Sequence, residues 1–339
     1  MKEVLSLFGF DQNDYDVRSY GSGLINHTWV VEGKEEKYIL QRVNDNVFKR
    51  PEDIDTNLRV VANYLKENFK DYRFIAPHKT VNGKTLVYIN GEGYYRAFPF
   101  VKNSHSFDVV EKPELAYEAA RQFGMFTKLL SGIDMKDLKI TLPSFHDLSL
   151  RHTQYLEALK NGNEQRIKES ADFIRRLNKH SNIAEEYEQI KANPDFKLRV
   201  THHDTKISNV LFDNKEKGIC VIDLDTVMPG YFISDVGDMM RTYLSPVSEE
   251  EKDYSKIEIR DEFYKAIVEG YKEQMNDELT QTEKRYFLYA GTFMIYMQAL
   301  RFLTDYLNND IYYGEKYPGH NYVRAGNQIT LLEKLIAKT

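Results

Sequence analysis

The strongest signal in the chain is the run Thr201-His202-His203-Asp204-Thr205-Lys206-Ile207-Ser208-Asn209. Two short β-prone segments follow it, residues 210–212 and 218–223, and the second one ends in Asp223. The pattern therefore predicts a polar loop, a hairpin and then a carboxylate. Phosphoryl transfer needs such a set, because one carboxylate orients or deprotonates the attacking hydroxyl. An amide and a second carboxylate then hold Mg²⁺ on the nucleotide phosphates.

The spacing of these groups favours this interpretation. The chain reads His202-x-Asp204-x₄-Asn209, and Asp223 follows after the hairpin, which is the order of the catalytic loop and the metal-binding loop in kinases.

An alternative chemistry is a metal hydrolase that uses His202, His203, Asp204, Asp223 and Asp225. Adjacent His side chains point in different directions, and the sequence has no second His and Asp cluster that would complete a two-metal cage. This alternative is therefore disfavoured.

The residues before the motif predict a small antiparallel sheet with one inserted helix. Apolar spacing over residues 54–65, behind Pro51, is typical of an amphipathic helix. Asn-Gly pairs at residues 82–83 and 90–91 are strong hairpin signals, because Asn and Gly tolerate positive φ. Three strands before the helix and two after it make five. These five strands are expected among six β-prone segments, residues 15–20, 28–31, 38–43, 79–81, 85–89 and 94–101.

Most of the chain beyond residue 102 reads as helical. The predicted helices are residues 114–130, 165–177, 252–275 and 282–307. We therefore predict an α+β, protein-kinase-like bilobal fold. Residues 1–102 would form a nucleotide-binding lobe with a five-stranded antiparallel sheet and one helix. Residues 103–339 would form a mostly helical lobe with the catalytic loop and the substrate site.

Composition excludes several other classes. The chain has 339 residues, of which 42% are hydrophobic and 29% charged, and no run approaches the roughly 18 apolar residues of a membrane helix. Residues 1–10 do not resemble a secretory signal. The single Cys220 excludes internal disulfides and suits a reducing cytoplasm, and a net charge of −6 argues against broad nucleic-acid binding. We expect a cytoplasmic monomer without nucleic-acid or membrane partners.

A second motif, Gly21-Ser22-Gly23, lies between the first two predicted strands. Its glycines allow the backbone to approach a phosphate closely, and its hydroxyl and amides can donate hydrogen bonds. It is neither a Walker A loop nor a Rossmann fingerprint.

Together these features resemble the aminoglycoside phosphotransferase and choline-kinase family of kinase-like small-molecule kinases. The chain is most similar to the bacterial N-acetylhexosamine 1-kinases, from about residue 18 to residue 330. The matching stretches are Ile39-Leu40-Gln41-Arg42-Val43-Asn44, Asn46-Val47-Phe48, residues 203–209, residues 220–230, Asp235-x-Gly237-Asp238, Arg301-Phe302-Leu303-x-Asp305-Tyr306-Leu307 and His320-Asn321-x-Val323-Arg324.

The resemblance implies ATP-dependent phosphorylation of the anomeric hydroxyl of GlcNAc or GalNAc, with ATP and Mg²⁺ bound and a small sugar as the partner. It implies Asp204 as catalytic base in contact with the 1-hydroxyl, and Asn209 and Asp223 as Mg²⁺ ligands. The nucleotide contacts that it implies are Gly21, Ser22, Gly23 and a hinge that includes Phe98, Phe100 and Val101.

Two predictions are less direct. Kinases place a Lys on the third strand, paired with a Glu on the helix, but here that strand offers Gln41 or Arg42. Strand alternation puts the two on opposite faces, so only one can reach ATP, and we favour Arg42. Its helix partner is left open among Glu52, Asp53 and Asp55.

In the substrate site, Arg301 interrupts an apolar stretch and either pairs with Asp305 or binds sugar hydroxyls. We favour sugar binding. Further candidates for sugar contact are Asp204, Asp225, His320, Arg324 and Tyr317, with Tyr312 and Tyr313 nearby.

Three alternatives stay open. One is a kinase for another small alcohol, such as an aminoglycoside, choline or homoserine; aminoglycosides and choline are cations and would require an acidic acceptor pocket. Another is an inactive nucleotide- or sugar-binding protein. A protein kinase fits least, because no activation segment follows Asp223.

Overall fold

The computed structural model describes residues 1–11, 13–21 and 25–338. The chain divides into two compact units: the first comprises residues 1–106, 129–143 and 210–229, and the second comprises residues 107–128, 144–209 and 230 onwards. A single division at residue 102 does not separate them, because the hairpin after residue 210 joins the first unit. There the His105 N–H donates to the Phe212 carbonyl (3.0 Å) and the Phe212 N–H donates to the His105 carbonyl (2.8 Å).

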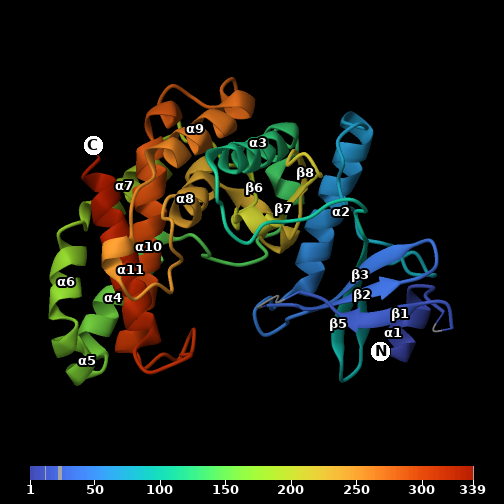
Figure 1. Ribbon diagram of the computed structural model, residues 1–339, viewed down its shortest axis with the longest axis horizontal. Coiled ribbons are helices and arrows are strands. Elements are labelled where there is room, and N and C mark those ends of the chain that lie inside the picture. Colours follow the sequence, from blue (N-terminus) through green and yellow to red (C-terminus); the bar gives the residue numbers. More distant parts are fainter. Residues whose placement is uncertain (12, 22–24, 339) are drawn as a thin grey trace. The chain divides into compact units, whose positions relative to one another are not determined.

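The first unit contains the predicted five-stranded antiparallel sheet, in the order β1-β2-β3-β5-β4. One helix, α2, follows the third strand, as predicted (Figure 1). The elements of this unit are α1 (Lys2–Leu7), β1 (Asp16–Ser19), β2 (His27–Glu32), β3 (Lys37–Val43), α2 (Pro51–Asn68), β4 (Val87–Ile89), β5 (Gly93–Pro99), β7 (Val210–Phe212) and β8 (Gly218–Val221).

The register gives the two faces of the sheet different chemistry. Leu40 on β3, with Tyr95 and Ala97 on β5, joins Val4 and Phe8 of the α1 region in one apolar core. The opposite face carries polar side chains, since Gln41 of β3 lies directly across from Arg96 of β5. This polar face therefore places the guanidinium group of Arg96 within the first unit.

The second unit is mostly helical, as predicted. Its elements are α3 (Pro113–Leu129), α4 (Leu148–Asn161), α5 (Glu164–Glu169), α6 (Ala171–Asn178), α7 (Asn182–Ala192), β6 (Arg199–Thr201), α8 (Phe232–Tyr243), α9 (Asp261–Met275), α10 (Phe287–Leu307) and α11 (His320–Ile336), and the chain enters this unit through β9 (Met228–Gly230).

Helix α10 is the central element of this unit, and α11 lies beside it (Figure 1). Of its 21 residues, only Leu288, Arg301 and Thr304 are not buried, which explains its mostly apolar sequence. Helix α8 packs closely on α10 at Gly237, where an added Cβ would lie 2.3 Å from the Ala290 carbonyl oxygen. No helix among the described residues is long and apolar enough to cross a membrane.

Three predicted elements differ from the structure. Residues 79–81 form no strand, because the Thr80 N–H donates to the Lys84 carbonyl (2.7 Å) and closes the turn at residues 82–83. The helix predicted over residues 165–177 is two helices, since Ser170 leaves helical geometry (φ −89°, ψ 6°). Residues 254–256 form a separate 3₁₀ turn before α9, because the Asp253 side chain accepts a hydrogen bond from the Ser255 N–H.

Candidate active site

The loop after β6 is held in place by two carboxylates of α8. Asp235 accepts hydrogen bonds from the backbone N–H groups of His202 (3.0 Å) and His203 (2.7 Å). Asp238 accepts one from the Thr205 N–H (2.9 Å). Burial raises the pKa of Asp235 to about 7, because its effect exceeds that of the two backbone hydrogen bonds, which lower the pKa. The carboxylates thus fix the backbone on both sides of Asp204.

Asp204 itself lies beside a cation. The Lys206 Nζ is 3.0 Å from Asp204 Oδ1, and the carboxylate retains 22% of its exposure. Burial alone would raise the pKa of Asp204, but Lys206, His202 and Arg241 together hold it below its usual value. The carboxylate is therefore ionised at neutral pH and can accept a proton from a hydroxyl.

The backbone is strained next to this carboxylate. His203 has φ +66°, in the left-handed region that residues with a Cβ rarely adopt. Gly230 makes room for the resulting ring position, because a Cβ there would lie 2.5 Å from His203 Nε2 and 2.4 Å from Thr201 Oγ1. This contact explains why the Met228-Pro229-Gly230 run ends in glycine.

Asn209 is a suitable oxygen ligand for Mg²⁺. Its Nδ2 donates to the Asp204 carbonyl (2.8 Å) and to Asp204 Oδ2 (3.1 Å), which directs the amide and leaves Oδ1 as its acceptor atom. Asp223 belongs to the first unit and has a left-handed backbone (φ +58°). Amide and carboxylate oxygens are the hard ligands that Mg²⁺ prefers, so both residues fit the predicted metal role. Within the described chain, no group of three or more His, Cys, Asp or Glu forms the cage that a hydrolase would need.

The predicted nucleotide residues lie in the first unit. Gly21 has φ +72°, which requires glycine, whereas Ser22 and Gly23 lie outside the described residues. Next to Gly21, the Tyr20 ring is 6.4 Å from the Phe100 ring. The predicted glycine turn therefore begins beside the predicted hinge of Phe98 to Val101, although neither role is tested by these contacts.

The structure does not support Arg42 as the phosphate-holding cation. Arg42 lies across from Tyr95, on the sheet face that packs against α1. The cation on the opposite face is Arg96, which donates to Gln41 Oε1 through Nε (3.1 Å) and Nη2 (2.9 Å). Arg96 was missed from sequence, although a lone Arg within the apolar strand Gly93–Pro99 is a signal that a partner is present.

Arg96 has a buried partner in Asp225. Its Nη1 is 2.5 Å from Asp225 Oδ1, and both side chains are 4% exposed. Asn26 Nδ2 donates to the other carboxylate oxygen (2.8 Å). Since both oxygens are engaged within the first unit, Asp225 belongs to this sheet cluster, and we withdraw it from the predicted sugar contacts.

The helix acids do not pair with β3 either. Glu52 accepts from the Tyr94 hydroxyl (2.6 Å), Asp53 pairs with Arg50 (3.1 Å), and Asp55 pairs with Arg59 (2.9 Å). None of these three acids forms a counterpart of the Lys–Glu pair of protein kinases, and Arg96–Asp225 is a buried ion pair on the polar face of the sheet.

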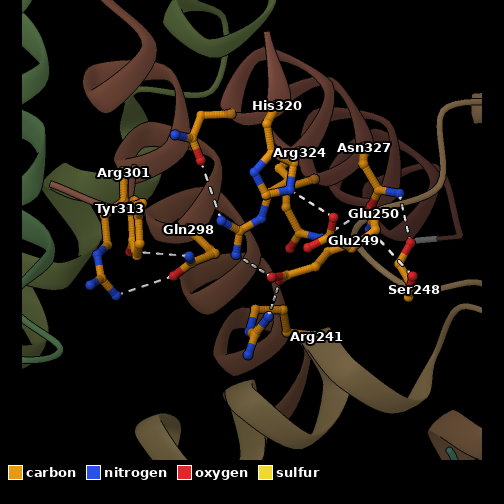
Figure 2. Close-up of polar contacts among 12 residues, drawn as sticks. Arg241, Ser248, Glu249, Glu250, Gln298, Arg301, Tyr313, His320, Arg324 and Asn327 are labelled. Atoms are coloured by element: carbon orange, nitrogen blue, oxygen red, sulfur yellow. Dashed lines mark hydrogen bonds and ion pairs between the residues drawn. The ribbon is translucent and has the colours of Figure 1, made fainter. Parts of the chain in front are cut away.

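The predicted sugar residues of the second unit fall into two groups (Figure 2). Glu249 lies between Arg241 (2.8 Å) and Arg324, whose guanidinium also stacks on the Phe302 ring at 3.7 Å. His320 Nε2 lies 2.7 Å from Glu250 Oε2. Arg324 and His320 are thus bound to carboxylates of the segment after α8.

Tyr317 lies beside His320. The two ring centroids are 4.9 Å apart, and Lys252 Nζ lies 3.9 Å above the Tyr317 ring. The ring therefore already contacts a His and a Lys, and a stacking role on a sugar stays a prediction.

Arg301 behaves differently from Arg324. It does not pair with Asp305, because that carboxylate accepts the backbone N–H groups of Tyr312 (2.7 Å) and Tyr313 (2.9 Å). Its hydrogen bond goes to the neutral Gln298 Oε1 (3.2 Å), as Figure 2 shows, and it makes no ion pair in the described chain. The structural ion pair considered from sequence is therefore wrong.

Comparisons with known proteins agree with this arrangement. The model of the phosphotransferase enzyme family (APH) matches residues 16–280, which is more than half of the chain. The chain belongs to this family. It is accordingly a phosphotransferase.

Solved structures show the same fold at low sequence identity. A microcompartment-associated aminopropanol kinase is similar with a TM-score of 0.70 and 16% identity, over 99% of this chain and 97% of that one. An aminoglycoside phosphotransferase from Alicyclobacillus acidocaldarius gives 0.64 and 14%, over 100% and 96%. An ethanolamine kinase of Plasmodium vivax gives 0.62 and 14%, over 100% and 90%. The predicted kinase-like α+β fold is thereby confirmed.

Proposed function

We propose that this kinase phosphorylates the anomeric hydroxyl of an N-acetylhexosamine, GlcNAc or GalNAc, and releases the sugar 1-phosphate. In this proposal Asp204 accepts the proton of the 1-hydroxyl as its oxygen attacks the γ-phosphorus of ATP. The bond from the γ-phosphorus to the bridging oxygen breaks, and ADP leaves. Such a reaction asks for positioning and charge stabilisation more than for covalent chemistry.

The surroundings of Asp204 suit that role. Asp235 and Asp238 fix the loop backbone, and the low pKa of Asp204 keeps the carboxylate ionised. Lys206 lies 3.0 Å from the same carboxylate. In this proposal its positive charge stabilises the negative charge of the phosphoryl group during transfer. Asn209 and Asp223 would hold Mg²⁺, which when bound neutralises phosphate charge.

The observation that supports a polyhydroxy acceptor is the state of Arg301. Its guanidinium has one neutral hydrogen-bond partner and lies near the rings of Phe145 (6.0 Å), Tyr312 (6.0 Å) and Tyr313 (5.4 Å). Planar N–H donors can bind ring hydroxyls or an acetamido oxygen, and aromatic faces can stack on the C–H groups of a pyranose.

Cationic acceptors fit this surface poorly. Asp238 and Glu249 are paired with Arg241 and Arg324, and Asp305 is bound by backbone N–H groups. An aminoglycoside or choline would need an available carboxylate, whereas Asp238 and Glu249 are paired with arginines and both Asp305 oxygens already accept N–H groups.

A panel of acceptors tests the proposal. We would measure ATP consumption with GlcNAc, GalNAc, glucose, choline, ethanolamine and an aminoglycoside, each in the wild type and in Arg301→Met. We expect turnover on the two N-acetylhexosamines, and a KM for them that rises by roughly tenfold or more in Arg301→Met. Arg175→Met, which removes an exposed arginine, is the control and should leave this KM unchanged. Turnover on choline or an aminoglycoside alone would contradict the proposal.

A further inference from the structure

A cavity of about 460 Å³ lies beside α4 and α10 in the second unit. Arg151 of α4, Arg301 and Thr304 of α10, and Tyr312 and Tyr313 after α10 form part of its wall. Arg301 and Thr304 are thus two of the three positions of α10 that are not buried, and both line this cavity. The cavity therefore accounts for two of the three positions at which α10 is not buried.

Two guanidinium groups of this wall have no carboxylate partner. Arg151 donates to Gln154 Oε1 (3.0 Å) and to the Ser144 carbonyl (3.1 Å), and Arg301 donates to Gln298. Among the described residues their hydrogen bonds go to neutral oxygens and not to a carboxylate. Several other arginines of the same unit bind carboxylates, in the pairs Arg166–Asp310, Arg176–Glu333, Arg199–Glu283, Arg241–Asp238 and Arg324–Glu249, whereas Arg260 resembles Arg151 in donating to backbone carbonyls.

The two cations also affect each other. Burial lowers the pKa of Arg151, and the charge of Arg301 lowers it further, whereas Tyr312, Tyr313 and Asp147 raise it through smaller effects. Arg151 lies in the first turn of α4, where the helix dipole disfavours a cation. Holding two like charges together in a partly desolvated wall is unfavourable unless an anion joins them.

The acids of the wall do not supply that anion. Asp305 accepts two backbone N–H groups and the Asn321 amide (3.1 Å), so its oxygens are already engaged. Glu157 is exposed and accepts from Asn161. Meanwhile Arg151 Nε and Thr304 Oγ1 are buried atoms for which the described chain offers no hydrogen-bond partner. The wall thus holds spare donors and spare positive charge.

We propose that this cavity is an anion subsite in which Arg151 and Arg301 bind one phosphate or carboxylate group. Two guanidinium forks match the oxygens of such a group, and the Thr304 hydroxyl adds a donor. The anion comes either from an acidic substituent on the acceptor sugar or from a free phosphate bound beside a neutral sugar. The first source rests on the proposed function, and the second does not.

Arg151 is the residue to test, since it has no part in the proposed transfer reaction. We would compare the wild type with Arg151→Gln and Arg151→Lys, and with Arg175→Gln as a control for loss of one exposed arginine. The binding measurement is the change in Tm with inorganic phosphate at ionic strength held constant with NaCl. The kinetic measurement is kcat/KM for GlcNAc and for N-acetylglucosamine 6-phosphate, which keeps a free anomeric hydroxyl.

We expect phosphate to raise the Tm of the wild type and of Arg175→Gln. The Tm of Arg151→Gln should not rise, and that of Arg151→Lys should rise by a smaller amount than in the wild type. If the acidic sugar is the source, its kcat/KM falls by roughly tenfold in Arg151→Gln while that for GlcNAc changes less than about threefold. A phosphate effect without turnover of the acidic sugar assigns the subsite to free phosphate.

Two results together would overturn the inference. Phosphate would change the Tm of the wild type and of Arg151→Gln equally, or change neither, and kcat/KM for the acidic sugar would be the same in both proteins. Absence of GlcNAc turnover in the wild type would refute the proposed function instead, and the phosphate measurement would still decide on the subsite.

Discussion

The catalytic loop and the polar face of the small sheet hold their charges in contrasting ways. The loop depends on partners close in sequence, since His203 binds Asp235 across 32 residues, on the next helix. The sheet cluster depends on distant ones: Asn26 binds Asp225 across 199 residues and Arg96 binds Gln41 across 55. The catalytic loop can therefore be predicted from a sequence motif, whereas the sheet cluster depends on strand register and on tertiary contacts.

Breaking the sheet cluster should have the largest effect on stability. Arg96→Met leaves the buried Asp225 carboxylate without its cation, which typically costs about 3–5 kcal/mol. We expect a clear fall in the midpoint of urea unfolding. The double variant Arg96→Met with Asp225→Leu should recover part of that loss, and no recovery would show that the pair is not coupled.

Weakening the support of the loop should have the next largest effect. Asp235→Asn keeps the size of the side chain but presents an amide N–H to one of the two backbone donors, at a cost of about 1–3 kcal/mol. We expect a lower Tm together with reduced kcat. A variant with normal Tm and normal kcat would contradict the support role assigned to α8.

The sequence predicted the loop motif well because Asp204 and Asn209 lie only five residues apart in the chain. Asp204 and Asn209 are in contact, as their spacing suggested, and the five-stranded sheet follows from its turn signals and alternation. The choice between Gln41 and Arg42 failed because it depended on which face of β3 meets Arg96 and Asp225. No pattern within the strand encodes that. The sequence also did not predict that Arg301 lacks an ion pair with Asp305. That carboxylate accepts hydrogen bonds from the backbone N–H groups of Tyr312 and Tyr313 instead.

The pH dependence of the reaction tests the charge next to Asp204. The base acts when ionised, so kcat/KM falls as the pH drops through the pKa of Asp204. Lys206 lowers that pKa, and Lys206→Met should therefore move the acid limb of the profile to higher pH. The measurement is kcat/KM against pH in both proteins; an unmoved limb would show that another group controls it.

The smallest effect is expected at Arg42. Because its side chain lies on the α1 face of the sheet, Arg42→Gln should change the KM for ATP by less than about twofold, within the range of ordinary surface substitutions. Arg96→Lys, which alters the opposite face with little loss of charge, serves as the comparison and should raise that KM more. A large effect at Arg42 would restore the prediction made from sequence.

The most direct test of the central claim is product formation from GlcNAc and from its methyl glycoside, in which the anomeric hydroxyl is blocked. With ATP and Mg²⁺, we expect a sugar 1-phosphate, identified by ³¹P NMR, from GlcNAc and no phosphorylated product from the glycoside. Asp204→Asn should lower the GlcNAc rate by roughly 10²–10⁴-fold at unchanged Tm, because it removes the base without removing volume. Equal phosphorylation of GlcNAc and its methyl glycoside, or full activity of Asp204→Asn, would contradict the account.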